Sequence, residues 1–363
     1  MKRAGAGISK LILSLGAVAS LSLSGCSSFA PERLYQDQIG YSESLGDSQK
    51  AQTLLNVVRL RYGDFPVFLK TTQVISGYSL QQTVGASLVP SAGWNSVVGT
   101  PGVTVGQTPT FTYQPVTGEA LAQSFVRPLS PSELLPLTVS GIPVDVLFRL
   151  SVQSVNGLTN VRLLESGGRG GSSGFAKLLV NLRRLQKADL IGVRLDQKGG
   201  GDPKAKAAGR LMLTIAAGGD PASRAVADET RAMLGFRPGS TEAEVVYGRA
   251  PSAGGKVSVL TRSMLGVLSF VASEVEVSEA DVSRGSTMGT ASYADILRRP
   301  AVVVRSGEKA PKDAFSRIDY RGRAYWIEND DFDSKLAFSV IQMLMSLAET
   351  PQGGGPVVTV PAR

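Results

Sequence analysis

Two serine motifs in this chain have residue types that nucleophilic chemistry uses. Gly170-Gly171-Ser172-Ser173-Gly174 fits the G-x-S-x-G pattern of a nucleophile elbow, and Ser306-Gly307-Glu308-Lys309 fits the S-x-x-K pattern in which a lysine activates a serine. An elbow needs a strand before it and a base for the serine proton, but glycines precede Ser172 and the chain has no histidine. The S-x-x-K pair needs a helix, which Pro311 disfavours. We therefore interpret the first motif as a loop and the second as a chance match.

The third candidate for chemistry is the acidic run Glu328-Asn329-Asp330-Asp331-Phe332-Asp333. Its carboxylates could bind Ca²⁺ at Asp330, Asp331 and Asp333, because hard cations prefer oxygen ligands. The run lacks the glycine and the final glutamate of an EF-hand loop, and it comes directly before an expected helix. Carboxylates at that place often cap the helix and offset its dipole. We therefore predict a helix cap, with calcium as the alternative, and no metal or catalytic residue.

The composition excludes several classes of chemistry. The absence of histidine and the presence of one cysteine, Cys26, exclude Ser-His-Asp and Cys-His machinery, zinc bound by these residues within one chain, and an internal disulfide. The net charge of +8 is spread along 363 residues, so it suits an anionic envelope surface better than nucleic acid. We expect no cofactor and no enzymatic activity, although two carboxylates from distant positions could still act together.

Cys26 stands at the end of an export signal. Basic residues near the start precede an apolar run over 11–23, which is too short to span a bilayer stably. The ending Leu23-Ser24-Gly25-Cys26 resembles the lipobox of bacterial lipoproteins. This resemblance implies that the signal peptide 1–25 is removed and that Cys26 carries the lipid, with acyl chains such as palmitate. It also implies membrane attachment through the N-terminus.

Two further observations concern the location. Ser27 follows the cysteine, whereas Asp at this position commonly retains Gram-negative lipoproteins in the inner membrane, so the resemblance implies an outer-membrane anchor with the body in the periplasm. The segments 54–69, 152–158 and 356–360 resemble proteobacterial lipoproteins of unknown activity. That resemblance supports a place in the cell envelope and implies no activity.

The segment from Thr71 to Gly118 contains no charged residue, although charged residues make up 19% of the chain. Apolar and small polar residues alternate along both halves, on either side of a loop expected over 90–96. This period of two predicts a long hairpin with one aliphatic face and one small, uncharged polar face. The aliphatic positions are Val74, Tyr78, Leu80, Val84, Ala86, Leu88, Val97, Val103, Val105, Phe111 and Tyr113. Pro101 and Pro109 predict that the return strand is an edge strand or a bulged strand.

The hairpin leaves two interpretations open. Each half exceeds the 9–11 residues that a membrane-spanning strand needs, and the lack of charge suits hydrocarbon. Because one hairpin cannot enclose a channel, spanning would require a ring of subunits, similar in architecture to the lipoprotein channel that exports curli subunits. Alternatively, the hairpin packs on the soluble body.

The remaining sequence predicts an α+β fold of amphipathic helices and antiparallel hairpins arranged as ββα units. We expect helices at 47–62, 119–126, 132–138, 143–155 and 175–187. We expect strand pairs at 190–195 and 211–216, at 244–247 and 256–260, and at 316–320 and 324–328, each followed by a helix, and a last strand at 357–360. The expected regions are a signal peptide (1–25), a flexible tether (26–46), a helix with the hairpin (47–157) and an α+β domain (158–363).

These features predict a lipid-anchored envelope protein that acts as a non-enzymatic scaffold or assembly subunit of an envelope or export complex. Its partners would be envelope proteins or further copies of itself. The first alternative is an oligomeric pore that uses the hairpin 71–118. The second alternative is a carboxylate-dependent enzyme that acts on envelope polysaccharide.

Overall fold

A computed structural model describes residues 29–91, 94–160, 162–163, 169–170, 172–196, 209–251, 254–290, 299–348 and 358–361. The fold is α+β, as predicted. The chain divides into two units, Met1–Thr53 and Leu54–Arg363, and helix α2 (Phe29–Arg61) begins in the first and ends in the second. The prediction of a flexible tether over 26–46 is wrong from residue 29 onward. Pro31 lies in the first helical turn, where a missing amide is tolerated, and glycines weaken a helix without necessarily ending it.

The core of the second unit contains a six-stranded mixed sheet with the strand order β4-β3-β10-β9-β8-β7. Its strands are β3 (Val152–Val155), β4 (Leu158–Thr159), β7 (Ile191–Asp196), β8 (Arg210–Ile215), β9 (Glu242–Tyr247) and β10 (Val257–Thr261). Because β3 and β4 pair with each other and β3 also pairs with β10, the predicted boundary between 157 and 158 falls inside one sheet. Residues on both sides of this position therefore fold together.

The first ββα unit is confirmed: β7 and β8 are antiparallel, and α7 (Pro221–Met233) follows them. The prediction of an antiparallel hairpin in the second unit is wrong, because β9 and β10 are parallel, with Val257 opposite Val245. Between them, Gly254 and Gly255 adopt positive φ angles, and the Gly254 carbonyl accepts a hydrogen bond from Arg237 at 2.8 Å. The connection therefore reverses the chain, and β10 begins opposite Val245 and runs parallel to β9.

Helices α4 (Pro131–Val139), α5 (Val144–Ser151) and α6 (Ser173–Lys187) pack on the sheet, and α7 packs beside α6. Ser130 and Glu133 form a capping box at the start of α4, which explains why this short helix begins after Ser130. A small apolar pocket of about 10 Å³ lies between these helices and the sheet. It is lined by residues that include Leu135, Phe148, Leu182, Leu213 and Val259, and it has room for about one water molecule. The packing here is nearly complete.

Helix α5 ends earlier than the predicted helix over 143–155, and the chain continues directly as strand β3. The buried Arg262 donates to the carbonyl oxygens of Arg149, Leu150 and Val152 at 2.8–3.0 Å. The Asn160 amide also donates to Arg149 and Val152. These side chains donate to the last carbonyls of the helix in place of the amides of a further helical turn. The chain after Ser151 instead pairs with β10 as strand β3, so the helix ends there.

A second sheet contains β11 (Arg305–Gly307), β12 (Ser316–Tyr320) and β13 (Arg323–Ile327), with β13 in the centre. Arg321 and Gly322, which lie between the predicted strands 316–320 and 324–328, join β12 to β13, and both residues have positive φ, as a tight two-residue hairpin turn requires. Helix α10 (Phe332–Ala348) follows and packs on α5, α8 (Met264–Ala272) and a π-helical turn, η1 (Ala122–Val126). This confirms the order of the third ββα unit. The shorter elements are α3 (Gly118–Leu121), α9 (Glu279–Ser283), β5 (Arg162–Leu163) and β6 (Arg169–Gly170).

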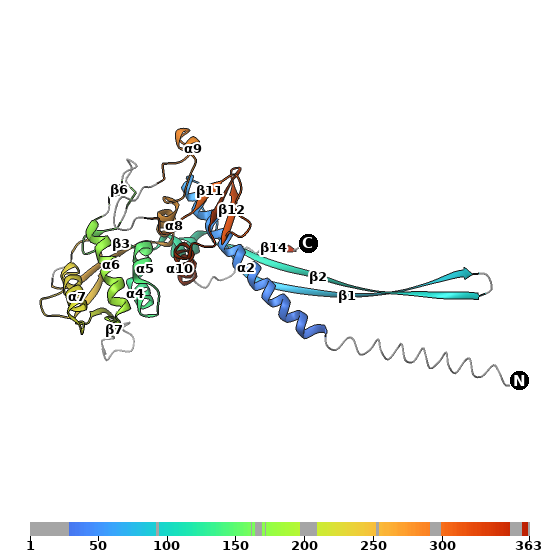
Figure 1. Ribbon diagram of the computed structural model, residues 1–363, viewed down its shortest axis with the longest axis horizontal. Helices are drawn as coiled ribbons and strands as arrows, with labels where there is room; N and C mark the ends of the chain where they lie inside the picture. Colours follow the sequence, from blue (N-terminus) through green and yellow to red (C-terminus); the bar gives the residue numbers. More distant parts are fainter. Residues whose placement is uncertain are drawn as a thin grey trace. The chain divides into compact units, whose positions relative to one another are not determined.

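Strands β1 (Leu69–Ser91) and β2 (Trp94–Pro115) form the predicted long antiparallel hairpin (Figure 1). The register pairs Leu80 with Val105 and Leu88 with Val97, so the aliphatic positions of the two strands share one face of the ladder, as predicted. The last strand, β14 (Val358–Pro361), adds to β2 opposite Thr110–Tyr113. The structure therefore extends the hairpin to a three-stranded sheet near its base.

The register decides between the two expectations for the return strand, because β2 is an edge strand before Thr110 and has no bulge at either proline. Pairing continues through Pro101, opposite Val84, and through Pro109, opposite Ser76, and along the described strand residues the register shifts only between Thr71 and Gln73. Proline is compatible with an intact ladder where its missing amide would point away from the partner strand. The two prolines therefore interrupt nothing between β1 and β2, although β2 is an edge strand beyond the end of β14.

Candidate functional site

The residues that the sequence marks for chemistry do not assemble into one reactive centre. Cys26 lies outside the described residues. Ser172 caps helix α6 by accepting a hydrogen bond from the Phe175 amide at 3.1 Å, which is a structural role. Ser306 lies in strand β11, and Lys309 follows that strand in a bend instead of sharing a helix with it. The interpretation of the S-x-x-K match as chance agrees with this geometry.

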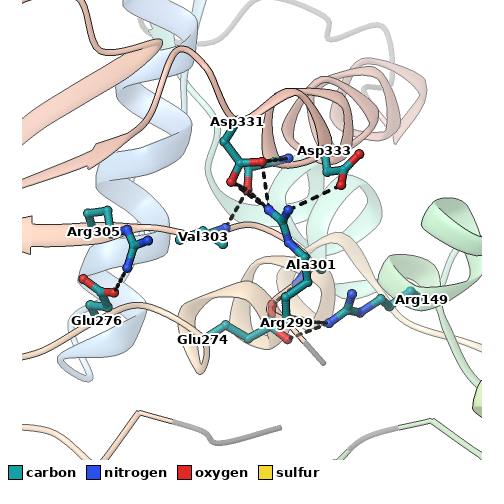
Figure 2. A network of polar contacts seen from close by, with 10 residues as sticks. Arg149, Glu274, Glu276, Arg299, Ala301, Val303, Arg305, Asp331 and Asp333 are labelled. Atoms are coloured by element: carbon teal, nitrogen blue, oxygen red, sulfur yellow. Dashed lines mark hydrogen bonds and ion pairs between the residues drawn. The ribbon is translucent and has the colours of Figure 1, made fainter. Parts of the chain in front are cut away.

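Two carboxylates of the acidic run before α10, Asp331 and Asp333, contact Arg299 (Figure 2). Asp331 accepts two hydrogen bonds from Arg299, at 2.7 and 2.8 Å, and caps the helix by accepting from the Ser334 amide at 3.1 Å. Asp333 contacts the same guanidinium at 3.3 Å. Partial burial acts to raise the pKa of Asp331, but the hydrogen bonds from Arg299 and Ser334 outweigh burial and hold the pKa below its usual range. This geometry favours the capping interpretation over calcium binding.

The same network fixes the chain segment that leads into β11. Ser334 accepts a hydrogen bond from the Val303 amide at 2.9 Å, and Glu274 accepts one from the Ala301 amide at 2.7 Å (Figure 2). Arg149 donates to the carbonyl of Arg299. Side chains from α5, the end of α8 and the start of α10 therefore hold a segment that has no regular secondary structure of its own.

Glu274 is the most deeply buried carboxylate of this network. Its side chain is 0% exposed and lies 3.8 Å from Arg149. Burial lowers the pKa of the neighbouring Arg262 to about 10, although the charge of Glu274 acts to raise it. Arg262 therefore stays charged at neutral pH, contacting three carbonyl oxygens and lying over the Phe270 ring. The arrangement satisfies the carbonyl oxygens at the end of α5.

A second polar cluster joins two tyrosines near the end of α2 and strand β13. The hydroxyl oxygens of Tyr62 and Tyr325 lie 2.6 Å apart, and Tyr62 donates to Asp281 at 3.0 Å. Burial is the main reason why the pKa of Tyr62 lies well above its ordinary value, so this phenol stays protonated. Arg321 lies over the Tyr62 ring at 5.3 Å and pairs with Asp64 at 3.0 Å. These contacts connect the start of the hairpin segment to the second sheet.

In the described part of the chain, no three histidine, cysteine or carboxylate residues gather closely enough to hold a metal ion. Within the same residues, no helix combines the length and the apolar character needed to cross a membrane. The feature whose sequence and geometry point to interaction is the hairpin of β1 and β2. It has no charge from Thr71 to Gly118, and β1 is the terminal strand of its sheet.

The sequence predicted this hairpin and which alternating residues of each strand share its aliphatic face. It missed the attachment of β14 to β2, although the alternation of Val358 and Val360 around Thr359 signals a strand. It also missed the pairs Arg299–Asp331 and Arg149–Glu274, for which the sequence gives no signal because the partners lie far apart along the chain.

Comparisons with known proteins give no match to this chain. No protein-family model fits it, no curated protein resembles it, and no solved structure is similar to it. The resemblance of Leu23-Ser24-Gly25-Cys26 to a lipobox therefore stays a prediction.

Proposed function

We propose that this chain is a lipid-anchored protein of the outer membrane, facing the periplasm, and that it acts as a non-enzymatic assembly subunit of an envelope complex. The observation that carries this proposal is the hairpin Leu69–Pro115, which combines strands of 23 and 22 residues with a sequence that is uncharged from Thr71 onward and an outer edge on β1. Soluble proteins usually protect such an edge with charge, because an exposed edge templates pairing with another chain. A long unprotected edge is therefore suited to assembly.

The proposed assembly function can be tested by shortening the hairpin without changing its register. Removing 77–84 from β1 and 101–108 from β2 deletes residues that pair with one another and keeps every remaining position on its own face. We expect the body to unfold cooperatively as before, while the native complex in envelope extracts falls apart on native gels. If the shortened protein stays in a complex of unchanged size, the hairpin is not the assembly element.

The anchor needs a separate test, because assembly and attachment could fail independently. Cys26→Ser should leave the protein uncleaved or release it from the membrane fraction, and the lipid mass should disappear from the N-terminal peptide. Ser27→Ala is the matched control and should remain lipidated. Unchanged fractionation of Cys26→Ser without a lipid mass in the parent protein would contradict the anchor.

One observation favours an oligomeric pore as the second candidate. Where the chain enters the hairpin, Phe65, Val67 and Leu69 are exposed by 68%, 45% and 42%, while the intervening Pro66 and Phe68 are buried. This exposed apolar row is followed by Lys70 and then by the uncharged segment 71–118, and the row and the uncharged segment are suited to contact with lipid.

The pore can be tested with a charge on the aliphatic face. Val84→Asp at mid-hairpin should abolish dye release from vesicles, because a charge in hydrocarbon opposes insertion, whereas Thr83→Asp lies on the opposite face and serves as the control. Equal dye release by both variants, or none by the parent protein, would count against the pore. The enzyme alternative gains no support from the buried Glu274 or from Asp331, because both carboxylates bind arginine and backbone amides.

A further inference from the structure

One hydrogen bond at the base of the hairpin determines which residues of β1 and β2 bond to each other and which direct their amides outward; we call this alternation the hydrogen-bonding phase. The Val116 amide donates to the Phe68 carbonyl at 2.9 Å. Hydrogen-bonded and non-hydrogen-bonded pairs alternate along an antiparallel ladder, so the even-numbered residues of β2 bond to β1 and the odd-numbered residues direct their amides outward. The pairing of β14 is compatible with this phase, because Pro361, which has no amide hydrogen to donate, lies opposite the even-numbered Thr110.

Every proline in the two strands falls on an outward position. Pro101, Pro109 and Pro115 are odd-numbered residues of β2, and Pro90 of β1 pairs with Asn95, which is also odd. None of the four prolines therefore removes a hydrogen bond between β1 and β2. On β2 they remove outward donors, and β14 covers the interval opposite Thr110–Tyr113. The outer edge of β2 is consequently a poor template for another strand.

The outer edge of β1 has the opposite character. Its outward residues are the even-numbered ones, because they pair with odd residues of β2, and from residue 74 to 88 none is a proline and none is charged. They are Val74, Ser76, Tyr78, Leu80, Gln82, Val84, Ala86 and Leu88. The irregularity at Thr71 and Gln73 limits this open stretch at one end and Pro90 limits it at the other. The two edges of the hairpin are therefore inequivalent, and among the described residues no strand pairs with the outer edge of β1.

We propose that the β1 edge binds the β1 edge of a second copy of this chain, antiparallel and around a two-fold axis near Gln81. Full overlap of the open stretch places Val74 opposite Leu88 of the other copy and Tyr78 opposite its Val84. In this register, each even-numbered residue of β1 lies opposite an even-numbered residue of β1 in the other copy. The aliphatic faces of the two hairpins therefore form one continuous face. This inference rests on the proposed assembly function and specifies its partner.

A head-to-tail arrangement, in which β1 pairs with β2 of the next copy, is the alternative geometry and would suit a ring. It would place the outward positions of Pro101 and Pro109 against β1, where each lacks a donor for the facing carbonyl. The symmetric arrangement avoids this loss of hydrogen bonds. In it, the outward amides and carbonyls of β1 pair with the same groups of β1 in the second copy.

A single cysteine can detect the symmetric arrangement, because only a residue on a two-fold axis meets itself. In full-length protein extracted in detergent, Gln81→Cys should give a disulfide-linked dimer, since a non-hydrogen-bonded pair places its Cα atoms about 4.5 Å apart, within disulfide range. Single cysteines at Gly77 and Gly85 are the matched controls on the same face and should cross-link at least about tenfold less. The parent protein, whose only cysteine is Cys26, should give no dimer by this reaction.

Two matched prolines separate the edges. Leu80 and Val105 pair with each other and both direct their amides outward, so a proline at either position spares the ladder between β1 and β2. In the Gln81→Cys background, Leu80→Pro should reduce the cross-linked dimer by about tenfold or more, while Val105→Pro should leave it unchanged.

The outcomes distinguish the inference from the function on which it rests. Loss of the dimer with Val105→Pro, or links between Gln81→Cys in one tagged copy and Thr100→Cys, Thr104→Cys or Thr108→Cys in another, would replace symmetric pairing with head-to-tail pairing and leave the assembly function standing. Absence of every cross-link while the shortened hairpin still loses the complex would show a partner other than a second copy. Absence of cross-links together with an intact complex in the shortened variant would overturn both proposals.

Discussion

Replacing Asp331 with alanine is the sharpest test of the polar network. The change removes the cap of α10 and both hydrogen bonds from Arg299. Loss of a helix cap typically costs about 1 kcal/mol. The ion pair adds roughly 1 kcal/mol, because the Arg299 side chain is 40% exposed and its charge is partly screened. We therefore expect the free energy of unfolding to fall by about 2 kcal/mol, and Tm to fall by roughly 4–8 °C.

The assay is thermal and urea unfolding of Asp331→Ala beside Asp330→Ala, which alters an exposed neighbouring carboxylate. The pKa of Asp331 is depressed, so its contribution is fully present above the unfolded pKa near about 4 and is lost as the pH falls through the folded pKa. The difference between the parent and Asp331→Ala should therefore persist from pH 7 to about 5 and shrink below about 4. If both variants unfold like the parent at pH 7, the network does not stabilise α10 and the reasoning is wrong.

Three further perturbations test other parts of the body. Arg262→Lys should lower the free energy of unfolding by about 2–4 kcal/mol in urea titrations, because an ammonium cannot reproduce the planar contacts with three carbonyls; an effect below about 0.5 kcal/mol would refute this role. Tyr62→Phe should cost about 1–2 kcal/mol at pH 8 and less above pH about 10, because the stability from a phenol with a raised pKa is lost as the pH rises beyond the unfolded value; a pH-independent cost would count against it. Gly218→Ala should cost about 1–3 kcal/mol, because the new Cβ would lie 2.4 Å from Ser223 Cβ, whereas Gly219→Ala meets nothing within 4 Å and should be neutral; similar Tm values for the two would contradict the packing.

The location of most elements was predictable because their signals are local. The period of two in the uncharged segment gave both the hairpin and the face shared by Leu80 and Val105, since side chains alternate along a strand whatever surrounds it. The turn at Arg321 and Gly322 was predictable for the same reason, because the required positive φ angles depend on the residues of the turn itself.

Strand direction and helix ends needed tertiary information. Burial on both faces of β10 leaves no alternation that could distinguish parallel from antiparallel pairing with β9, and only the observed register shows that the two strands are parallel. The end of α5 depends on Arg262 and Asn160, which reach its carbonyls from other parts of the fold. The local pattern of apolar residues predicts a helix, but it cannot reveal hydrogen-bond donors from distant parts of the sequence that bind the carbonyls at the helix end.

The sequence by itself determined the export signal resemblance at Cys26, the exclusion of histidine and disulfide chemistry, the α+β class and an uncharged hairpin. Only the tertiary structure showed that Asp331 pairs with Arg299, which favours the helix cap over the cation site. Only the tertiary structure showed that β14 pairs with part of β2 and that β1 is the terminal strand of this sheet. The physical reason is that residue type and spacing fix local conformation, whereas hydrogen-bond and charge partners are chosen among all the groups that folding brings within reach.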